Sequence, residues 1–407
     1  MSKPNERDHP FCSVKHCVDP IVTRHYAALI ESVHAVLAVF GSMALAGRSK
    51  PLCLIFETAS GYGKTAVLQM VFPEPESELA EFVYRSDKFT PKAFVSHAAN
   101  VKENQRLKND LLPKLADKVL VTKELAPIFR GREEEMQANF SVLISVLDGK
   151  GFTSDSGMCG QRAYAYPIIF NWIGATTPLP ASTHRLMSQL GTRLLFYEVP
   201  AIIPTEEDLM AYALKDTAST AEDECRAAVT EFLEDFFRRH PVGSEPADSI
   251  KISEELTRDL VRWATFITGG RAEVKFERQG SNWEPVAAMP PEGPWKIINY
   301  LKDIARGHAL IHTRTAVNAC DLELVAHVAI SSIPGHLRPI VRALMGSAKV
   351  NTPTAASLCR VTDPTARSYM KQMSLLGIAD LVKGSARSNQ PDSLGLSTAY
   401  RWLKPPP

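Results

Sequence analysis

The sequence predicts an α/β protein whose centre is a parallel sheet covered by helices. Two observations carry this prediction: short apolar runs alternate with helical patterns, and Gly-rich turns separate them. Residues 52–57 form the first such run, a buried strand bounded by Pro51 and a Gly-rich turn. The other expected strands are residues 118–121, 168–174 and 194–199.

A long apolar stretch near the start of the chain predicts a buried helix over residues 20–47. Glu31, Ser32 and His34 interrupt the apolar run, which is typical of a core helix rather than of a membrane span. From residue 205 to residue 333 the pattern is mostly helical. The remaining expected elements are helices at 133–147, 294–310 and 321–333, a hairpin at 149–166 and a polar interruption at 269–293.

The charged residues are unevenly distributed along the 407-residue chain. The chain has 46 Lys/Arg and 45 Asp/Glu, a formal net charge of +1, which excludes a uniformly basic nucleic-acid-coating protein. Residues 335–407, however, contain ten Lys/Arg and three Asp/Glu, a net of +7, whereas residues 1–334 have a net of −6. A basic tail on an acidic body predicts a polyanionic partner for the tail.

The N-terminal residues predict no secretory signal, because residues 1–10 are polar and contain no apolar segment. Seven scattered cysteines fit reduced thiols, so we expect a cytoplasmic protein without a membrane partner. One N-terminal cluster has two interpretations, a metal site or a capping arm without metal. Its members are His9, Cys12, His16, Cys17 and His25.

A glycine-rich loop follows the first expected strand and precedes a helical pattern. Its sequence, Thr58-Ala-Ser-Gly-Tyr-Gly-Lys-Thr65, matches the P-loop pattern except that Thr58 replaces the first Gly. Gly61 and Gly63 allow backbone N–H groups to surround phosphate oxygens, and the start of the helix adds its dipole. Lys64 would reach the β- and γ-phosphates, and the Thr65 hydroxyl would bind Mg²⁺. The loop therefore predicts an ATP and Mg²⁺ site made by Ser60, Gly61, Tyr62, Gly63, Lys64 and Thr65.

The basic tail follows the winged-helix pattern of three helices and a β-wing. Helices are expected over 337–345, 352–359 and 364–376, and a strand from 377 to 382 leads through a loop to a returning strand. The third helix would enter the DNA major groove, with Met370, Met373 and Leu376 facing the core. The expected DNA contacts are Thr365, Arg367, Ser368 and Lys371 on this helix and Lys383 and Arg387 on the wing. A protein-docking tail is the alternative.

The order of motifs resembles that of the AAA+ ATPases over residues 20–333. The phosphate loop is followed by a strand with an acidic end, a strand with a polar end and a later arginine. The expected hairpin before the third strand and the winged-helix-like tail resemble the MCM-like helicase group. The resemblance implies four parts, an arm (1–19), an AAA+ core (20–204), a helical lid (205–334) and a winged-helix domain (335–407).

The resemblance also implies catalytic roles at two strand ends. Glu124 stands where the family polarises the attacking water, but Lys123 replaces the usual Mg²⁺-associated Asp, which leaves the hydrolysis rate open. Thr177 matches the polar sensor 1 position, with Thr176 and Asn171 as alternatives. A surface Glu and an ordinary strand cap are the structural alternatives for the two positions.

Two cations further along the chain match positions that act on phosphate in the family. Arg193 resembles the arginine finger that a neighbouring subunit supplies, with Arg185 as an alternative. Lys296 resembles sensor 2, with Arg271 as an alternative. An arginine finger implies self-assembly into a homo-oligomeric ring or spiral, a hexamer in this family. A salt bridge within the lid or a solvated helix face would be the structural role instead.

The expected hairpin at 149–166 resembles the hairpin that MCM-like rings point into their channel. Lys150 and Arg162 are its candidate DNA contacts, directed at phosphates and therefore independent of sequence. The same hairpin could instead pack on a neighbouring subunit.

The function implied is that of an ATP-dependent DNA-associated AAA+ ATPase, an MCM-like DNA helicase or helicase loader. The first alternative is an ATP-switched DNA-binding initiator or regulator with little turnover. The second is a protein-remodelling AAA+ ATPase of a mobile-element or phage-defence system.

Overall fold

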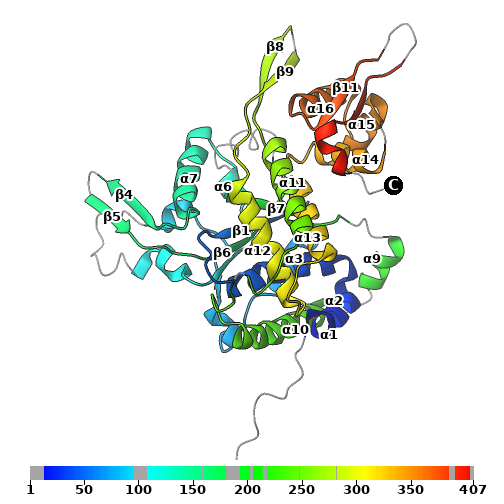
Figure 1. The fold of residues 1–407 in the computed structure, drawn as a ribbon. Coiled ribbons are helices and arrows are strands. Elements are labelled where there is room, and N and C mark those ends of the chain that lie inside the picture. The colour runs from blue at the N-terminus through cyan, green and yellow to red at the C-terminus, as the bar shows by residue number, and fades with distance from the viewer. Residues whose placement is uncertain are drawn as a thin grey trace, which may run out of the picture.

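A parallel sheet forms the centre of the computed structural model (Figure 1). The structure describes residues 13–95, 108–156, 160–179, 193–201, 205–213, 218–246, 248–280, 282–347, 349–384 and 390–403. Five parallel strands lie in the order β2-β3-β6-β1-β7. Their bounds are β1 Leu52–Glu57, β2 Val83–Arg85, β3 Val119–Thr122, β6 Asn171–Thr176 and β7 Leu195–Glu198. The sheet and its phosphate loop fit an α/β nucleotide-binding fold.

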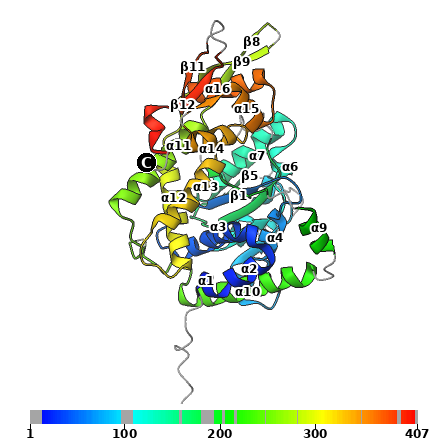
Figure 2. The same cartoon turned by 90° about the vertical axis from the view of Figure 1, so that its right-hand side faces the viewer.

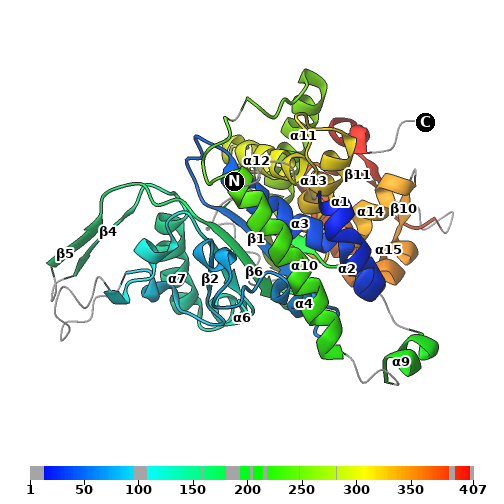
Figure 3. The same cartoon turned by 90° about the horizontal axis from the view of Figure 1, so that it is seen from below.

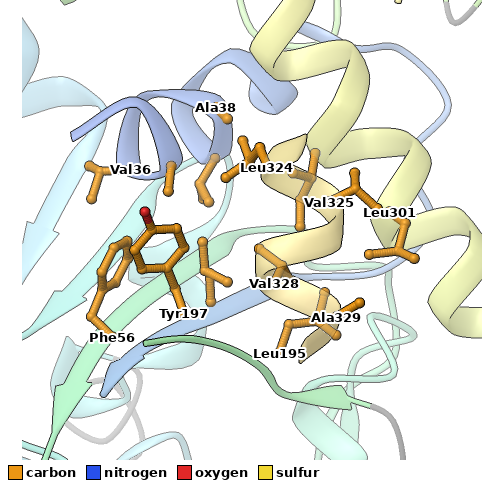
Figure 4. Close-up of a cluster of buried hydrophobic side chains, with 14 of the residues drawn as sticks. Val36, Ala38, Phe56, Leu195, Tyr197, Leu301, Leu324, Val325, Val328 and Ala329 are labelled. Atoms are coloured by element: carbon orange, nitrogen blue, oxygen red, sulfur yellow. The ribbon is translucent and has the colours of Figure 1, made fainter. Parts of the chain in front are cut away.

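The two faces of the sheet bury separate cores. Alternate residues of β1 point to opposite faces, so that Leu54 and Phe56 join one core while Cys53 and Ile55 join the other. The first core contains helices α3 (Ile30–Gly41), α4 (Lys64–Gln69), α10 (Ala218–Arg239), α12 (Trp295–Ile311) and α13 (Ala319–Ser331). Figure 4 shows part of this core, where Val36 of α3, Phe56 of β1, Tyr197 of β7 and Val325 of α13 converge. The second core is covered by α6 (Ala126–Phe129) and α7 (Glu133–Val146).

All four strands expected from apolar runs are present, and the sheet has one more. β2 was missed because it has three residues and buries only Val83. β6 begins at Asn171 rather than at residue 168. β7 lies at an edge of the sheet, where an unpaired strand needs protection. The hydroxyls of Ser332 and Ser331 accept from the N–H groups of Phe196 and Glu198, at 2.9 and 3.0 Å.

The helix expected over residues 20–47 is broken into α2 (Asp19–Tyr26), the 3₁₀ turn η1 (Ala27–Leu29), α3 and the 3₁₀ turn η2 (Ser42–Ala44). The stretch Asp19–Ala44 is long and apolar enough to cross a membrane, but 78% of the tested window is buried in the protein. It is therefore a core segment, as predicted. Gly41 and Gly307 let α3 and α12 approach closely, because a Cβ on Gly307 would lie 2.2 Å from the Ala38 carbonyl oxygen.

A β-hairpin interrupts the helical region that follows the sheet. The region contains α9 (Glu206–Ala213), α10, α11 (Glu254–Gly270), α12 and α13, with hairpin strands β8 (Val274–Gln279) and β9 (Asn282–Ala288) between α11 and α12. The sequence predicted only a polar interruption here, because β8 is exposed along most of its length and lacks an alternating pattern. Figures 1 and 2 show the hairpin projecting from this helical region beside the tail.

The tail contains three helices and a small antiparallel sheet, in the order expected. The helices are α14 (Arg338–Gly346), α15 (Thr352–Cys359) and α16 (Asp363–Leu375). The sheet order is β10-β12-β11, with bounds β10 Val350–Asn351, β11 Ala379–Val382 and β12 Ser393–Leu396. Met370 and Met373 are fully buried and Leu376 packs against the same core, as the pattern predicted.

The expected hairpin before β6 is also present, with strands β4 (Phe152–Ser156) and β5 (Gly160–Tyr164). Seen from below, it extends away from the sheet on the side of α7 (Figure 3). Gly151 begins it with a φ of +87°, and a Cβ there would lie 1.9 Å from the Tyr164 carbonyl oxygen. The hairpin can therefore close only with glycine at this position.

Candidate nucleotide-binding site

The phosphate loop connects β1 to α4 and has the backbone that the sequence predicted. Gly61 and Gly63 have φ values of +91° and +85°, in the region that favours glycine. At Gly63 there is also no room, because a Cβ would lie 2.7 Å from the Leu29 side chain. Thr58, in place of the first glycine, is buried, does not have a positive φ and donates its N–H to the Thr176 carbonyl at 3.3 Å. The missing glycine therefore leaves the loop unstrained.

Lys64 and Thr65 stand at the start of α4, where the family would bind phosphate and Mg²⁺. Lys64 is 7% exposed and its Nζ lies 3.5 Å from the Thr58 carbonyl oxygen, folded back over the loop. Ser60, Gly61 and Thr65 are exposed, and Tyr62 is half-buried. A glycine-rich turn at a helix start with a lysine folded over it fits a triphosphate, and a hydroxyl at the helix start fits its Mg²⁺.

Glu124 lies just beyond β3. It is therefore at the same edge of the sheet as the loop, namely the edge formed by the carboxyl ends of the parallel strands. Its Oε1 accepts from the Ala126 N–H at 2.8 Å, which fixes the carboxylate at the start of α6. Lys123 turns towards β2 instead, with Nζ 3.8 Å from Asp87 and 5.1 Å from the Phe72 ring. A hydrogen bond from Arg85 lowers the pKa of Asp87, so its carboxylate is already engaged.

Thr177 follows β6, the strand between β3 and β1, and so also lies at this edge. Its Oγ1 accepts from Arg130 Nη2 at 2.8 Å. Of the alternatives, Thr176 is buried with its hydroxyl on the Thr177 carbonyl. Asn171 lies at the opposite end of β6 and accepts from Arg48 at 2.7 Å, which excludes it as a sensor.

Arg130 is a cation at the candidate site that the sequence did not identify. It lies just after α6, is exposed, and reaches across to the end of β6. Its only sequence signal is a position six residues after Glu124, outside every motif. The structure thus brings the phosphate loop, Glu124, Thr177 and Arg130 together from three neighbouring strands.

Arg193 and Lys296 lie at the opposite edge of the sheet, which is formed by the amino ends of the parallel strands. Arg193 precedes β7, whose Leu195 pairs with Leu54 near the beginning of β1. The six residues of β1 separate this edge from the phosphate loop by about 20 Å. Neither cation can therefore reach the loop of its own chain.

One carboxylate holds both of these cations. Asp148 accepts from Arg193 Nη2 at 3.0 Å and from Lys296 Nζ at 3.2 Å, and Lys50 lies 3.8 Å away. Burial acts to raise the pKa of Asp148, but hydrogen bonds from Arg193 and Lys296 outweigh it, so the pKa is lowered. A basic cluster of Lys50, Arg193 and Lys296 around one ionised acid marks this edge. Arg185 lies outside the described residues.

Arg271, the alternative to Lys296, has a structural role. It is half-buried, and its guanidinium donates to the carbonyls of Leu194 and Ser332. Burial lowers its pKa to about 9. Because its donors are directed at backbone carbonyls, Arg271 joins α11 to the start of β7 and is not available to a phosphate.

A buried ion pair connects the base of the phosphate loop to the tail. Glu57, the residue before Thr58, accepts from the Leu179 N–H at 3.0 Å and pairs with Arg338 at the start of α14. Both side chains are at most 4% exposed. Glu198 at the end of β7 lies 3.9 Å from Arg338 and also pairs with Arg342. The tail is thus anchored at the edge of the sheet that carries the phosphate loop.

The predicted DNA contacts of the tail differ in their exposure. Arg367 and Lys383 are exposed, although Arg367 lies 3.9 Å from Asp392. Thr365 is half-buried beside the Thr362 hydroxyl, at 3.1 Å. Arg387 lies outside the described residues.

The hairpin β8–β9 covers part of α16, the helix that was expected to contact DNA. Lys371 pairs with Glu284 of β9 at 3.4 Å, and Ser368 and Gln372 line a cavity shared with Phe276 of β8. Ser368 and Lys371 are therefore half-buried in this conformation, because a hairpin distant in sequence packs on them, and both stay predictions as DNA contacts.

On the other hairpin, Lys150 is exposed just before β4. Arg162 lies in β5 opposite Ser154, and its side chain is outside the description. Both stay predictions as DNA contacts.

The N-terminal histidines and cysteine that the structure describes have separate partners. His16 bonds to Ser13 at 2.7 Å, and His25 bonds to Glu224 at 2.8 Å. Cys17 is disulfide-bonded, so the expectation of reduced thiols is wrong at this position, since spacing does not show which sulfurs meet in space. Cys53, Cys225, Cys320 and Cys359 are free thiols. His9 and Cys12 lie outside the described residues.

No family model matches the chain, and no curated protein matches its sequence. Among solved structures, the chain is similar to a full-length MCM homolog from Methanopyrus kandleri, with 13% identity and a TM-score of 0.41. The likeness covers 77% of this chain and 59% of that chain, so the chain spans less than two thirds of the length of this neighbour. A likeness of this degree makes it a distant structural neighbour and assigns no family.

Proposed function

We propose that the chain is a DNA-associated AAA+ ATPase that works as an MCM-like ring or spiral. The observation that supports this most is the division of the predicted site between two edges of one sheet. Lys64, Thr65, Glu124 and Thr177 lie at one edge, and the cations Arg193 and Lys296 lie at the other. A complete site then needs the first edge of one chain and the second edge of its neighbour.

The residues of the phosphate-loop edge have complementary chemistry for ATP hydrolysis. Backbone N–H groups of the loop and Lys64 bind the phosphates, and Mg²⁺, held by Thr65, would neutralise charge that develops on them. Glu124 accepts a proton from the attacking water. Arg130 donates to Thr177, which fixes the hydroxyl that would orient this water.

The neighbouring chain would supply positive charge to the transferring phosphate. Arg193 is 12% exposed and bound to Asp148 in the single chain, so the assembly has to release or share that ion pair. Lys296, at the start of α12, pairs with the same Asp148 carboxylate. The side chains of Lys296 and Arg193 are thus two neighbouring hydrogen-bond donors. An interface in which one face of a chain meets a different face of the next produces a ring if it closes and a spiral if it does not.

The ATP-switched regulator is the second candidate, and Lys123 favours it. A cation stands where the family carries an acid, and it is directed towards Asp87 rather than the loop. Such a site would bind nucleotide and assemble but turn over slowly.

Replacing Lys123 with Asp is expected to raise the ATP turnover number by about tenfold or more, because a second carboxylate would help hold Mg²⁺ near Thr65. Steady-state ATPase assays measure this. Lys123→Met is the matched control, since it removes the cation without adding an acid and should change turnover little. Equal turnover in Lys123→Asp and wild type would mean that this position does not limit hydrolysis.

The tail is proposed to be a winged-helix domain that binds DNA through α16. The succession α14, β10, α15, α16, β11 and β12, together with the net charge of +7 over residues 335–407, supports this proposal. In the described conformation the hairpin β8–β9 competes with DNA for Lys371. DNA binding would then require the hairpin to move away from α16.

Replacing Glu284 with Ala is expected to increase the affinity for duplex DNA. The ion pair with Lys371 is partly exposed and is worth up to about 1 kcal/mol, so the gain should be about two- to fivefold. Fluorescence anisotropy at fixed salt measures it. Glu277→Ala is the matched control, because Glu277 is opposite Glu284 in the hairpin and exposed. An equal gain in both variants would indicate a general charge effect and reject the competition.

The experiment that separates the three functions is an ATPase assay with and without single- and double-stranded DNA. The motor predicts stimulation by DNA, and the regulator predicts DNA binding with little turnover. A protein remodeller predicts an ATP turnover that DNA does not change and that Arg367→Ala leaves at the wild-type value.

A further inference from the structure

Three histidines from two packed segments, none of them a member of the N-terminal cluster, meet in the interior. His34 belongs to α3, His308 lies in the last turn of α12, and His312 is the residue directly after α12. One ring nitrogen from each lies within 4.8 Å of the others. His34 and His308 are 8% and 5% exposed, and His312 is half-buried. Histidines at positions i and i+4 of a helix share one face, so both rings point towards α3.

Carboxylates fix two of the three rings from outside the cluster. Asp321 of α13 bonds to His308 Nδ1 at 2.6 Å, and Asp19 of α2 bonds to His34 Nε2 at 2.7 Å. Asp321 is itself held by Arg314 and by the Asn318 N–H. A carboxylate on one imidazole nitrogen keeps the proton there and leaves the lone pair on the other nitrogen. This outer arrangement is typical of metal-binding histidines.

Among the residues that the structure describes, none makes a hydrogen bond to the buried Nε2 atom of His312. A buried imidazole nitrogen without a partner is uncommon in proteins, where such atoms usually find one. A metal ion would provide that partner.

We propose that His34, His308 and His312 form a zinc site that joins α3 to α12. Zn²⁺ binds imidazole nitrogen at about 2.0–2.1 Å in a tetrahedron, so its ligand nitrogens lie about 3.4 Å apart. Small rotations of the three rings would bring their nitrogens from their present separations to that distance. A water would complete the tetrahedron, and the charges of Asp19 and Asp321 would offset that of the ion. An all-nitrogen site disfavours Mg²⁺ and Ca²⁺, which prefer oxygen ligands.

The site would fix the lid relative to the phosphate loop without taking part in chemistry. Leu29, just before α3, packs against Gly63 of the loop, and α12 is the lid helix that begins beside Lys296. A metal between α3 and α12 would therefore fix the position of the phosphate loop relative to Lys296. The alternative is three histidines that pack against one another without a metal, with ring centroids 4.7–5.9 Å apart.

The test uses the full chain without a histidine tag. We expect about one zinc per chain by mass spectrometry of the purified protein, a melting temperature that falls with chelator and recovers with zinc, and visible absorption typical of four-coordinate cobalt after exchange. His312→Gln should weaken zinc binding by more than the roughly 10- to 100-fold typical of losing an outer partner. His25→Gln is the control, because His25 bonds to Glu224 outside the cluster.

Two results would overturn the proposal. The first is wild-type protein that contains no stoichiometric zinc and whose melting temperature does not respond to zinc or chelator. The second is zinc binding that His312→Gln leaves unchanged, which would place the metal elsewhere. The cobalt spectrum and the metal content of the wild type keep the proposal testable even if His312→Gln fails to fold.

Discussion

Replacing Arg193 with Ala is expected to lower ATP turnover by about a thousandfold while each chain still binds nucleotide. A cation that neutralises charge on the transferring phosphate contributes about 10³–10⁵ to turnover when a partner chain supplies it. Arg193 lies at the edge of the sheet opposite the phosphate loop, so its loss should not alter the loop of its own chain. Steady-state ATPase assays and binding of a fluorescent ATP analogue measure the two quantities.

The control for Arg193 is Arg258→Ala, which removes an exposed cation of α11 that pairs only with its neighbour Glu254 among the described side chains. Its turnover should stay close to that of the wild type. A loss of nucleotide binding in Arg193→Ala equal to its loss of turnover would contradict the assigned role. It would mean that Arg193 supports the fold through Asp148 and not the reaction.

Replacing Glu124 with Gln is expected to lower turnover by at least about a hundredfold and to leave ATP binding intact. General-base catalysis contributes about 10²–10⁴ to rate, and an amide cannot accept the proton of the water. Gln keeps the shape of the side chain and its oxygen can still accept from the Ala126 N–H, so the start of α6 should survive. Single-turnover hydrolysis and equilibrium binding measure the effect.

The matched control is Glu135→Gln, because Glu135 is an exposed carboxylate in the first turn of α7. If Glu124→Gln hydrolyses ATP at the wild-type rate, Glu124 is only a helix cap. Another group would then have to accept the proton of the attacking water.

The local features of this fold could be predicted from the sequence, because each depends on neighbouring residues. The run Leu52–Glu57 is apolar on both faces and could only be a buried strand. The glycines of the phosphate loop predict positive φ angles, and Gly61 and Gly63 have them. The tail helices were found within one or two residues, because Asn351 and the prolines near the helix starts mark their boundaries.

The contacts between distant segments, on which the proposed function depends, could not be predicted. Nothing near Asp148 in the sequence indicates that it forms ion pairs with Arg193 and Lys296. Arg130 reaches Thr177 only because β3 and β6 are neighbours in the sheet. The hairpin β8–β9 has exposed residues on both faces, so its strands lack the period-2 pattern that identifies a half-buried strand.

The most direct test of the account mixes two inactive variants. Lys64→Ala lacks the phosphate lysine, Arg193→Ala lacks the trans cation, and each alone should have almost no ATPase activity. If one site is built from two chains, an equal mixture should recover activity, because about a quarter of head-to-tail interfaces would then combine an intact loop with an intact Arg193. A mixture as inactive as its components, under conditions where both variants assemble, would contradict the shared site.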